Sequence, residues 1–224
     1  MFTLNALPNA LPSELVSKLR KAEPATIGHF RNWGFMDPAI RAMQSDVRIA
    51  GPAVTVRAPG VDGTIVGYAL GQVRPGDVLI IDRCGDHRHA AFGGLVAYAC
   101  KVARLAGVII DGVATDIGEV RRYGVPLWCR GLSALTTKRI GLAGEFCVPV
   151  SCGGVDVRPG DVVIADECGI VVLPPAEAEA IAERAIGMQD AEATSRKRLD
   201  AGEKLPDISG ATKMLQEALA KQKP

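Results

Sequence analysis

The hydrophobic positions of the chain follow two periods that alternate along its length. Short runs at 78–81 and 108–110 are apolar throughout, which is typical of strands buried on both faces of a parallel sheet. At 64–70 and 93–106 the apolar residues instead recur every three or four positions, which predicts helices. Strands that alternate with helices predict an α/β fold, in which helices flank a mixed sheet.

Both ends of the chain have helical patterns. Ser13 is the expected N-cap of a first helix, and a second short helix is predicted at 27–33. A long Ala- and Glu-rich helix begins at Pro174-Pro175 and ends near Gly202. We therefore divide the chain into a helical lead-in at 1–23, a main domain at 24–175, and a C-terminal helix and tail at 176–224.

One segment of the main domain occurs twice. VRPGDVLIIDRCG at 73–85 recurs as VRPGDVVIADECG at 157–169. Pro-Gly-Asp is a good turn before any buried strand, so the repetition has a simple local explanation. The shared Asp-x-Cys-Gly ending favours the alternative, in which the two segments form pseudo-equivalent strands of a barrel-like sheet.

Composition narrows the possible partners. The chain has 224 residues, of which 26 are basic and 25 acidic, so it carries no field that would attract nucleic acid. It has no apolar run long enough to cross a membrane and no pattern of a signal peptide. The six cysteines lie far apart without a C-x-x-C pair, which favours reduced thiols. We expect a cytoplasmic protein.

Acidic residues follow the predicted strand at 108–110. Asp111, Asp116 and Glu119 lie where a buried strand ends and a helix begins. Carboxylates at the carboxyl end of such a strand are well placed to bind a hard divalent cation. In the alternative interpretation Asp116 is only the N-cap of the next helix, and Glu119 completes a capping box. The sequence leaves both open.

A second polar segment, DHRHAAFGG at 86–94, leads into a predicted helix. Gly93-Gly94 and the free N–H groups of that helix form a potential site for a carboxylate or phosphate. His87 and His89 are candidates for metal ligands or for an acid and base, or they belong to an exposed polar loop. The chain has none of the common nucleotide-binding, serine-hydrolase or zinc-protease motifs.

These landmarks, taken in order, resemble one family, which joins the regulator of ribonuclease activity A (RraA) to the 4-hydroxy-4-methyl-2-oxoglutarate aldolases. The resemblance covers about residues 24–200. It implies a swivelling β/β/α domain that forms homotrimers or hexamers, with active sites between subunits. The matching segments are IAGPAVTV at 49–56, PGD at 75–77, GGL at 93–95, GVIIDG at 107–112, Asp116, Pro126, VPV at 148–150, GG at 153–154 and PGD at 159–161.

The resemblance also implies a site and a chemistry. In the aldolases an Asp that matches Asp116 binds Mg²⁺ or Mn²⁺, largely through water, and the acid three residues later matches Glu119. A Glu from the adjacent subunit's C-terminal helix matches Glu192 most nearly. The metal supports retro-aldol cleavage of a small 2-keto acid to pyruvate, or decarboxylation of oxaloacetate. The amides that hold the pyruvyl group match Gly93, Gly94, Leu95 and Val96.

This chain departs from the aldolase pattern at two positions. The Arg before the metal-binding Asp is replaced by Thr115, and an acid about twenty residues earlier is replaced by Gly94. Threonine cannot supply the positive fork of an arginine. The nearest substitutes in sequence are the polar residues of the segment before Gly93, namely Asp86, His87, Arg88 and His89.

We therefore expect a divalent-metal-dependent lyase with an altered anion site. Arg88 and Thr115 would contact substrate, and Asp86, His89 and Glu192 would take part in proton transfer. The first alternative is a non-catalytic protein like the ribonuclease regulators, which binds and inhibits a partner enzyme. The second is a different metal-dependent enzyme that uses His87 and His89.

Overall fold

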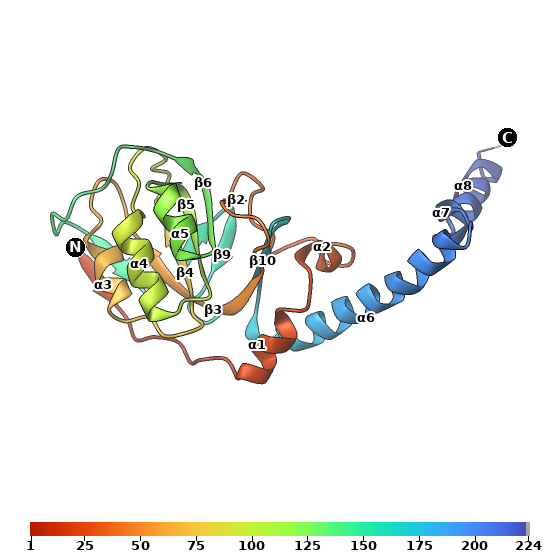
Figure 1. The fold of residues 1–224 in the computed structure, drawn as a ribbon, viewed down its shortest axis with the longest axis horizontal. Helices are drawn as coiled ribbons and strands as arrows, with labels where there is room; N and C mark the ends of the chain where they lie inside the picture. The colour runs from red at the N-terminus through yellow and green to blue at the C-terminus, as the bar shows by residue number, and fades with distance from the viewer. Residues whose placement is uncertain (223–224) are drawn as a thin grey trace.

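A nine-stranded mixed sheet forms the centre of the molecule in the computed structural model, which describes residues 1–222 (Figure 1). A separate two-stranded ribbon packs beside it. The strands of the sheet are β1 (Phe2–Leu4), β2 (Arg41–Ala42), β3 (Ile49–Arg57), β4 (Val78–Asp82), β5 (Gly107–Ala114), β6 (Leu127–Leu132), β7 (Gly144–Phe146), β10 (Val162–Asp166) and β11 (Gly169–Leu173). The ribbon consists of β8 (Val150–Cys152) and β9 (Val155–Val157).

Strands β3, β4, β5 and β6 are parallel and pair in that order. Strand β10 pairs antiparallel with the first half of β3. Strand β10 pairs in turn with β11 as a hairpin. At the other end of the sheet β7 pairs antiparallel with β3 and parallel with β1. The expected α/β fold with a mixed sheet is confirmed.

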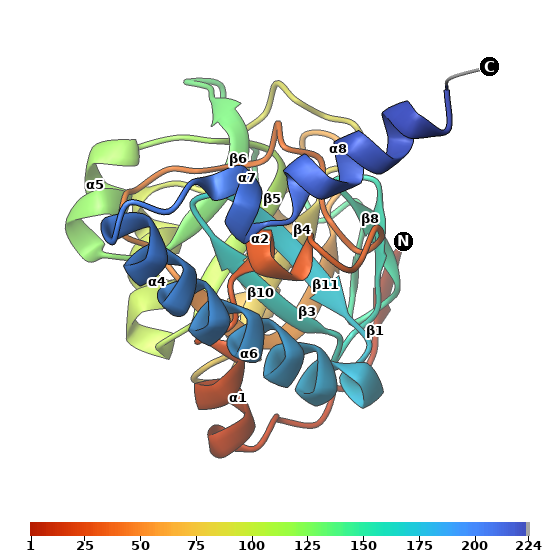
Figure 2. The same ribbon diagram turned by 90° about the vertical axis from the view of Figure 1, so that its right-hand side faces the viewer.

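Helices form two groups on opposite sides of the molecule (Figure 1), and Figure 2 looks onto the group that contains α6. Helices α3 (Thr64–Leu70), α4 (Gly94–Ala103) and α5 (Ile117–Tyr123) cover one face of the parallel strands. On the far side, α1 (Ser13–Leu19), α2 (Pro24–Ile27) and α6 (Pro175–Asp200) cover the β10–β11 hairpin. Helix α6 then projects from the body and carries α7 (Leu205–Ile208) and α8 (Ala211–Ala220) at its far end (Figure 1).

The repeated segment forms the same local structure twice. In each copy a carboxylate of the turn accepts the N–H of the arginine three residues earlier, at 2.8 Å from Asp77 to Arg74 and 2.8 Å from Asp161 to Arg158. Each turn leads into a strand that begins beside the same part of β3, where Ala53 pairs with Val78 and Pro52 with Val162. The repeat therefore recurs as a turn followed by a buried strand, but the two strands are not equivalent in the sheet, because β4 runs parallel to β3 and β10 runs antiparallel to it.

Both strands of the repeat are buried on both faces, as their wholly apolar sequences predict. In β4, Leu79 and Ile81 pack beneath α3–α5, whereas Val78 and Ile80 pack in a second core that includes Trp128. The period of two in a strand sends alternate side chains to opposite faces. The second core lies between the parallel strands, the β8–β9 ribbon and the β10–β11 hairpin.

Several predictions about the ends of the chain are wrong. The lead-in at 1–23 is not only helical, because it begins with β1, which adds to the sheet beside β7. The helix predicted at 27–33 is absent: α2 ends at Ile27, and the next residues form turns in which the Arg31 side chain donates to the carbonyl of Trp33 at 3.1 Å. Ser13 is the first helical residue of α1 and does not cap it with its side chain.

The long C-terminal helix agrees with its prediction, since α6 ends at Asp200 just before Gly202, whose φ is +89°. Within residues 1–222, no helix combines the length and the apolar character needed to cross a bilayer.

Candidate active-site cleft

Asp116 lies in the short connection between β5 and α5, in a conformation that few residues other than glycine adopt. Its φ of 51° and ψ of 38° are left-handed, which is favourable only for glycine and, to a lesser degree, for Asn and Asp. This backbone turns the carboxylate away from α5 and towards the start of α4. There Oδ2 accepts the N–H of Gly94 at 2.9 Å, and Oδ1 accepts the hydroxyl of Thr115 at 3.3 Å.

The capping alternative for Asp116 is therefore wrong in its main feature. Asp116 occupies the N-cap position of α5, but its side chain makes no hydrogen bond to that helix. The backbone carbonyl of Asp116 accepts the N–H groups of Glu119 and Val120 instead, at 2.8 and 3.1 Å. The carboxylate thus contacts a different helix, and helix capping does not account for it.

Gly93 and Gly94 make room for the two acidic side chains. A Cβ atom on Gly93 would lie 2.7 Å from Oδ2 of Asp116, and one on Gly94 would overlap Oε2 of Glu119. The Glu119 carboxylate therefore fills the space that the first side-chain atom at position 94 would need. The missing acid at position 94 and the acid at position 119 are thus alternatives in space.

The two carboxylates suit a hard divalent cation only as a partial ligand set. Residues 1–222 contain no group of three or more His, Cys, Asp or Glu side chains arranged to hold a metal ion. Mg²⁺ commonly binds through one or two carboxylates and keeps several waters, so Asp116 and Glu119 fit that mode of binding. They do not fit a dedicated protein cage.

A cleft of about 320 Å³ opens beside Asp116. The first turn of α4 forms one wall, and its amides at Leu95 and Val96 have no carbonyl four residues earlier within the helix. The opposite wall is the loop between β6 and β7. The cleft is lined by Gly63, Val66, Gly67, Ala90, Ala91, Phe92, Gly93, Gly94, Leu95, Val96, Thr115, Asp116, Thr136, Thr137, Lys138 and Arg139.

Asp62 holds that loop in place, a role that the sequence did not reveal. Its buried carboxylate accepts the N–H of Leu142 at 2.6 Å and the N–H and hydroxyl of Thr64 at 2.9 and 2.6 Å. Burial by itself would raise the pKa of Asp62, but these hydrogen bonds outweigh burial and hold the pKa well below its usual range. Asp62 is therefore an ionised anchor for the loop wall of the cleft.

Asp86 belongs to a separate network, outside the residues that line the cleft with Asp116. It accepts the N–H of Arg88 at 2.8 Å and contacts Nδ1 of His89 at 2.8 Å and the guanidinium of Arg83 at 3.3 Å. Burial alone would raise the pKa of Asp86, but these hydrogen bonds and the neighbouring His89 lower it to about 2. The proposed proton-transfer pair Asp86 and His89 thus organises its own loop.

The remaining residues of that loop are not brought to Asp116 either. Arg88 contributes its carbonyl as the acceptor for the Ser133 hydroxyl, at 2.7 Å. His87 lies 3.9 Å from Asp111, and His89 contacts Asp86, so the two histidines belong to different clusters. The geometry does not support a metal site that they would share.

Asp111, the other acid of the β5 segment, is fully engaged within the protein. It accepts the N–H of Gly153 at 2.7 Å and pairs with the guanidinium of Arg130. Arg130 also pairs with Asp37 at 2.8 Å, and both aspartates raise the pKa of the guanidinium above its usual value. This cluster fastens β5 and β6 to the β8–β9 turn.

Glu192 lies on the projecting part of α6. Its carboxylate pairs with Arg196 one turn later, at 3.1 Å, and both side chains are exposed. It is not among the residues that line the cleft in this chain. Its contribution from an adjacent subunit stays a prediction.

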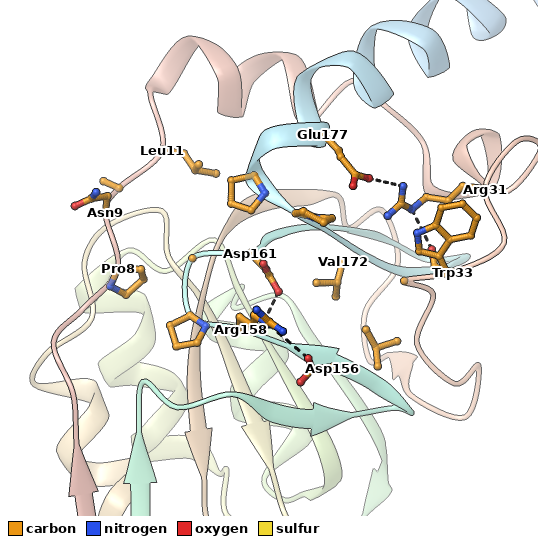
Figure 3. Close-up of a pocket in the computed structure, with 17 residues that line it drawn as sticks. Pro8, Asn9, Leu11, Arg31, Trp33, Asp156, Arg158, Asp161, Val172 and Glu177 are labelled. Atoms are coloured by element: carbon orange, nitrogen blue, oxygen red, sulfur yellow. Dashed lines mark hydrogen bonds and ion pairs between the residues drawn. The ribbon is translucent and has the colours of Figure 1, made fainter.

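A larger cavity of about 830 Å³ lies beside the start of α6 (Figure 3). Its charged groups pair with one another: Arg31 with Glu177 at 2.8 Å, and Arg158 with Asp156 at 3.6 Å. Burial raises the pKa of Asp161, which lies at the same cavity. Volume therefore favours this cavity. The Asp116 cleft instead has the Asp116 carboxylate, the open helix terminus and two cations, Lys138 and Arg139, that form no ion pair within residues 1–222, so we take the cleft as the candidate site.

A family model and two named relatives match most of this chain. A family model described as RraA-like, aldolase/RraA, matches residues 26–172. A protein of Halalkalibacterium halodurans named "Putative 4-hydroxy-4-methyl-2-oxoglutarate aldolase" is 35% identical over 158 residues, which cover 70% of this chain and 75% of that protein. A protein of Burkholderia multivorans with the same name is 32% identical over 137 residues, 61% of this chain and 82% of its own length.

A solved structure shows the same fold. The crystal structure of RraAS2 from Streptomyces coelicolor, described as an unusual member of the RNase ES inhibitor RraA protein family, superposes with a TM-score of 0.75 at 31% identity. The match covers 84% of this chain and 98% of that one.

Proposed function

Because the chain belongs to the aldolase/RraA family, we propose that it is a divalent-metal-dependent lyase that acts on small 2-keto acids. The proposed reactions are retro-aldol cleavage of substrates like 4-hydroxy-4-methyl-2-oxoglutarate to pyruvate, and decarboxylation of oxaloacetate. The observation that carries the proposal is the Asp116 carboxylate, which faces the open cleft without a cationic partner among the described residues.

The proposed metal is Mg²⁺ or Mn²⁺, held by Asp116 and Glu119. When bound, it would supply positive charge to offset the negative charge that develops on the keto oxygen. The space left by Gly93 and Gly94 admits both carboxylates, which supports this assignment.

The chain's own groups would position the substrate. The amides of Leu95 and Val96 point out of the first turn of α4, and the positive end of that helix favours a carboxylate there. We assign the carboxylate next to the keto group to these amides.

The proton of the distal hydroxyl needs an acceptor. Asp86 is a poor candidate, because its pKa is about 2 and its oxygens already accept hydrogen bonds within its loop. We propose Glu192 of an adjacent subunit in a homotrimer or hexamer, since α6 projects away from its own body (Figure 1).

The test is pyruvate release from 4-hydroxy-4-methyl-2-oxoglutarate, 4-carboxy-4-hydroxy-2-oxoadipate and oxaloacetate, with and without Mg²⁺ or Mn²⁺. We expect metal-dependent turnover that Asp116→Ala abolishes. Asp156→Ala, which removes an exposed carboxylate of β9 outside both the cleft and α6, is the control and should keep full activity. Absence of turnover of all three substrates by the wild-type protein would refute the lyase.

A regulatory function is the second candidate. It is favoured by the structural likeness to RraAS2 and, at 30% identity with a TM-score of 0.58, to a Thermus protein described as an RNA-processing inhibitor. Under this proposal the chain binds a partner enzyme and inhibits it. Inhibition of a purified ribonuclease by the wild-type protein and by Asp116→Ala alike would favour regulation over catalysis.

A further inference from the structure

We propose that Lys138 and Arg139 form the cationic clamp for the substrate's anionic groups, in place of the arginine that the aldolases carry where this chain has Thr115. The inference rests on the proposed function, because it assigns a substrate contact within the same cleft. It differs from the sequence-based expectation, which assigned that role to the segment at 86–89. Lys138 and Arg139 lie more than twenty residues after Asp116 but line the same cleft.

The two side chains carry charge that nothing in the described protein neutralises. Neither Lys138 nor Arg139 forms an ion pair within residues 1–222, whereas Arg57, Arg74 and Arg130 each pair with an aspartate or glutamate. Unpaired cations on a cleft wall attract an anionic ligand, and arginine binds a carboxylate through two parallel hydrogen bonds.

The backbone of Lys138 is held by hydrogen bonds of both its N–H and its carbonyl group. The N–H of Lys138 donates to the carbonyl of Val61 at 2.8 Å, and the carbonyl of Lys138 accepts the N–H of Gly63 at 2.9 Å. Position 63 has no room for a side chain, because a Cβ there would lie 2.5 Å from Oγ1 of Thr137. A clamp on a fixed backbone loses less conformational entropy when it binds.

The same loop is also tied to the α4 side of the cleft. The N–H of Ala90 donates to the carbonyl of Leu135 at 2.8 Å, and the N–H of Thr137 donates to the carbonyl of Ala90 at 3.0 Å. Ala90 precedes Gly93 by three residues, so these bonds join the cationic wall to the amide wall. The position of Lys138 and Arg139 relative to the helix start is therefore built into the fold.

The charge of the cleft fits a dianion. The formal charges of Asp116, Lys138 and Arg139, which line the cleft, and of Glu119 beside Gly94 sum to zero, although these side chains form no ion pairs with one another within the described residues. A divalent metal ion would therefore leave an excess of two positive charges. A 2-keto acid with a second carboxylate neutralises that excess. Thr115 cannot contribute, because its hydroxyl is uncharged and already donates to Asp116.

The test measures anion binding and catalysis separately. Oxalate, a dianion that the enzyme cannot cleave, is titrated calorimetrically into the Mg²⁺-loaded full chain of the wild type and of K138M/R139M. We expect the Kd of oxalate to rise by about 10- to 100-fold in the double variant, as for lost hydrogen bonds to a charged group. The matched control is R41M/R122M, which removes two exposed cations that lie outside the cleft and outside α6 and form no ion pair within the described residues.

Rescue distinguishes the clamp from a general effect of charge. T115R should restore oxalate binding in K138M/R139M and change the wild-type Kd by less than about threefold. In turnover assays the double variant should raise KM more than it lowers kcat. Should K138M/R139M unfold, the single variants K138Q and R139Q, with thermal unfolding measured alongside, provide the same comparison.

Each outcome supports or overturns the inference. Unchanged oxalate binding and KM in a folded, metal-dependent lyase would overturn the clamp and leave the proposed function standing. Oxalate binding that depends on Lys138 and Arg139 in a protein without turnover would keep the clamp and reject the lyase. A wild-type chain that does not bind oxalate at all would overturn the clamp.

Discussion

Asp111 and Asp116 are five residues apart in one segment, and the protein uses them in opposite ways. Asp111 lies within β5, where it pairs with Arg130 and accepts the N–H of Gly153. Asp116 lies just beyond the strand and accepts one N–H and one hydroxyl group. The charge of Asp111 is thus compensated by a cation, whereas that of Asp116 is not compensated by a cation within the described residues.

The difference shows what distinguishes a structural carboxylate from a functional candidate. Both aspartates follow a buried apolar run, so their place in the sequence is similar. A carboxylate held by a fixed cation has its charge neutralised in the absence of ligand. One that faces a cleft with only neutral donors keeps its charge available to a cation from outside. The partners of each residue, rather than its strand, decide its role.

The largest expected effect comes from Asp116→Asn. Asparagine tolerates the left-handed backbone and can still accept the Gly94 N–H, so the fold should be kept. We expect kcat/KM for pyruvate release to fall at least about 1000-fold, because the variant loses the charge that holds the metal. Thermal unfolding of the variant within a few degrees of the wild type would accompany this loss. Wild-type turnover in Asp116→Asn would contradict the distinction between the two aspartates.

Asp111→Asn should show the reverse pattern. It leaves the mostly buried Arg130 guanidinium with only Asp37 as its acidic partner. We expect the free energy of unfolding in urea to fall by about 2–4 kcal/mol, with kcat per folded molecule unchanged. The double variant Asp111→Asn/Arg130→Met should lose less unfolding free energy than the sum of the losses in the two single variants. Simple additivity would show that the two side chains are not coupled.

A smaller effect tests whether Glu119 replaces the acid expected at position 94. Gly94→Asp alone places its side chain against Glu119, and we expect it to lower kcat/KM by about 10- to 100-fold. Combining Gly94→Asp with Glu119→Ala moves the acid from one position to the other and should restore most of the activity. Pyruvate release by the double variant below that of Gly94→Asp would show that the two positions are not interchangeable.

The smallest expected effect concerns Asp86, which like Asp111 is compensated within the protein. Its folded pKa of about 2 lies below the unfolded value of about 3.9, so its stabilisation is complete above about pH 5 and is lost progressively as the pH falls towards 2. We expect Asp86→Asn to remove about 1–2 kcal/mol of unfolding free energy at pH 7 and much less at pH 2.5. Equal losses at the two pH values would exclude an ionic role for Asp86.

Much of the fold follows from local sequence because the elements at its centre are encoded locally. The wholly apolar run before Asp82 is typical of a strand that is buried on both faces, and β4 ends at the charged residue Asp82. By contrast, β1 has three exposed residues and exists because β7 lies beside it, which no local pattern indicates. The turns after Ile27 likewise depend on contacts of Arg31 with Trp33 and Glu177.

The residues of the candidate site likewise differ in whether local sequence predicts them. Gly93, Gly94 and Asp116 could be singled out because each lies at a predicted end of a strand or helix. Lys138 and Arg139 could not, because they reach the cleft through hydrogen bonds between segments more than forty residues apart, such as Thr137 to Ala90. Proximity in the sequence instead pointed to the segment at 86–89, whose residues do not line the cleft in this chain.

Helix α6 is expected to be less stable towards its C-terminal end, because its buried contacts lie near its start. Its buried residues are Ala178, Ala182 and Ala185, all in the first half of the 26-residue helix. At 1.5 Å per residue the helix is about 39 Å long, so its second half extends well beyond these contacts. In the isolated chain, backbone amides near Ala182 should exchange with deuterium slowly, and those near Arg196 should exchange orders of magnitude faster. Such a gradient would make the base of α6, where small methyl groups pack against the β10–β11 hairpin, more stable than the end that carries α7 and α8.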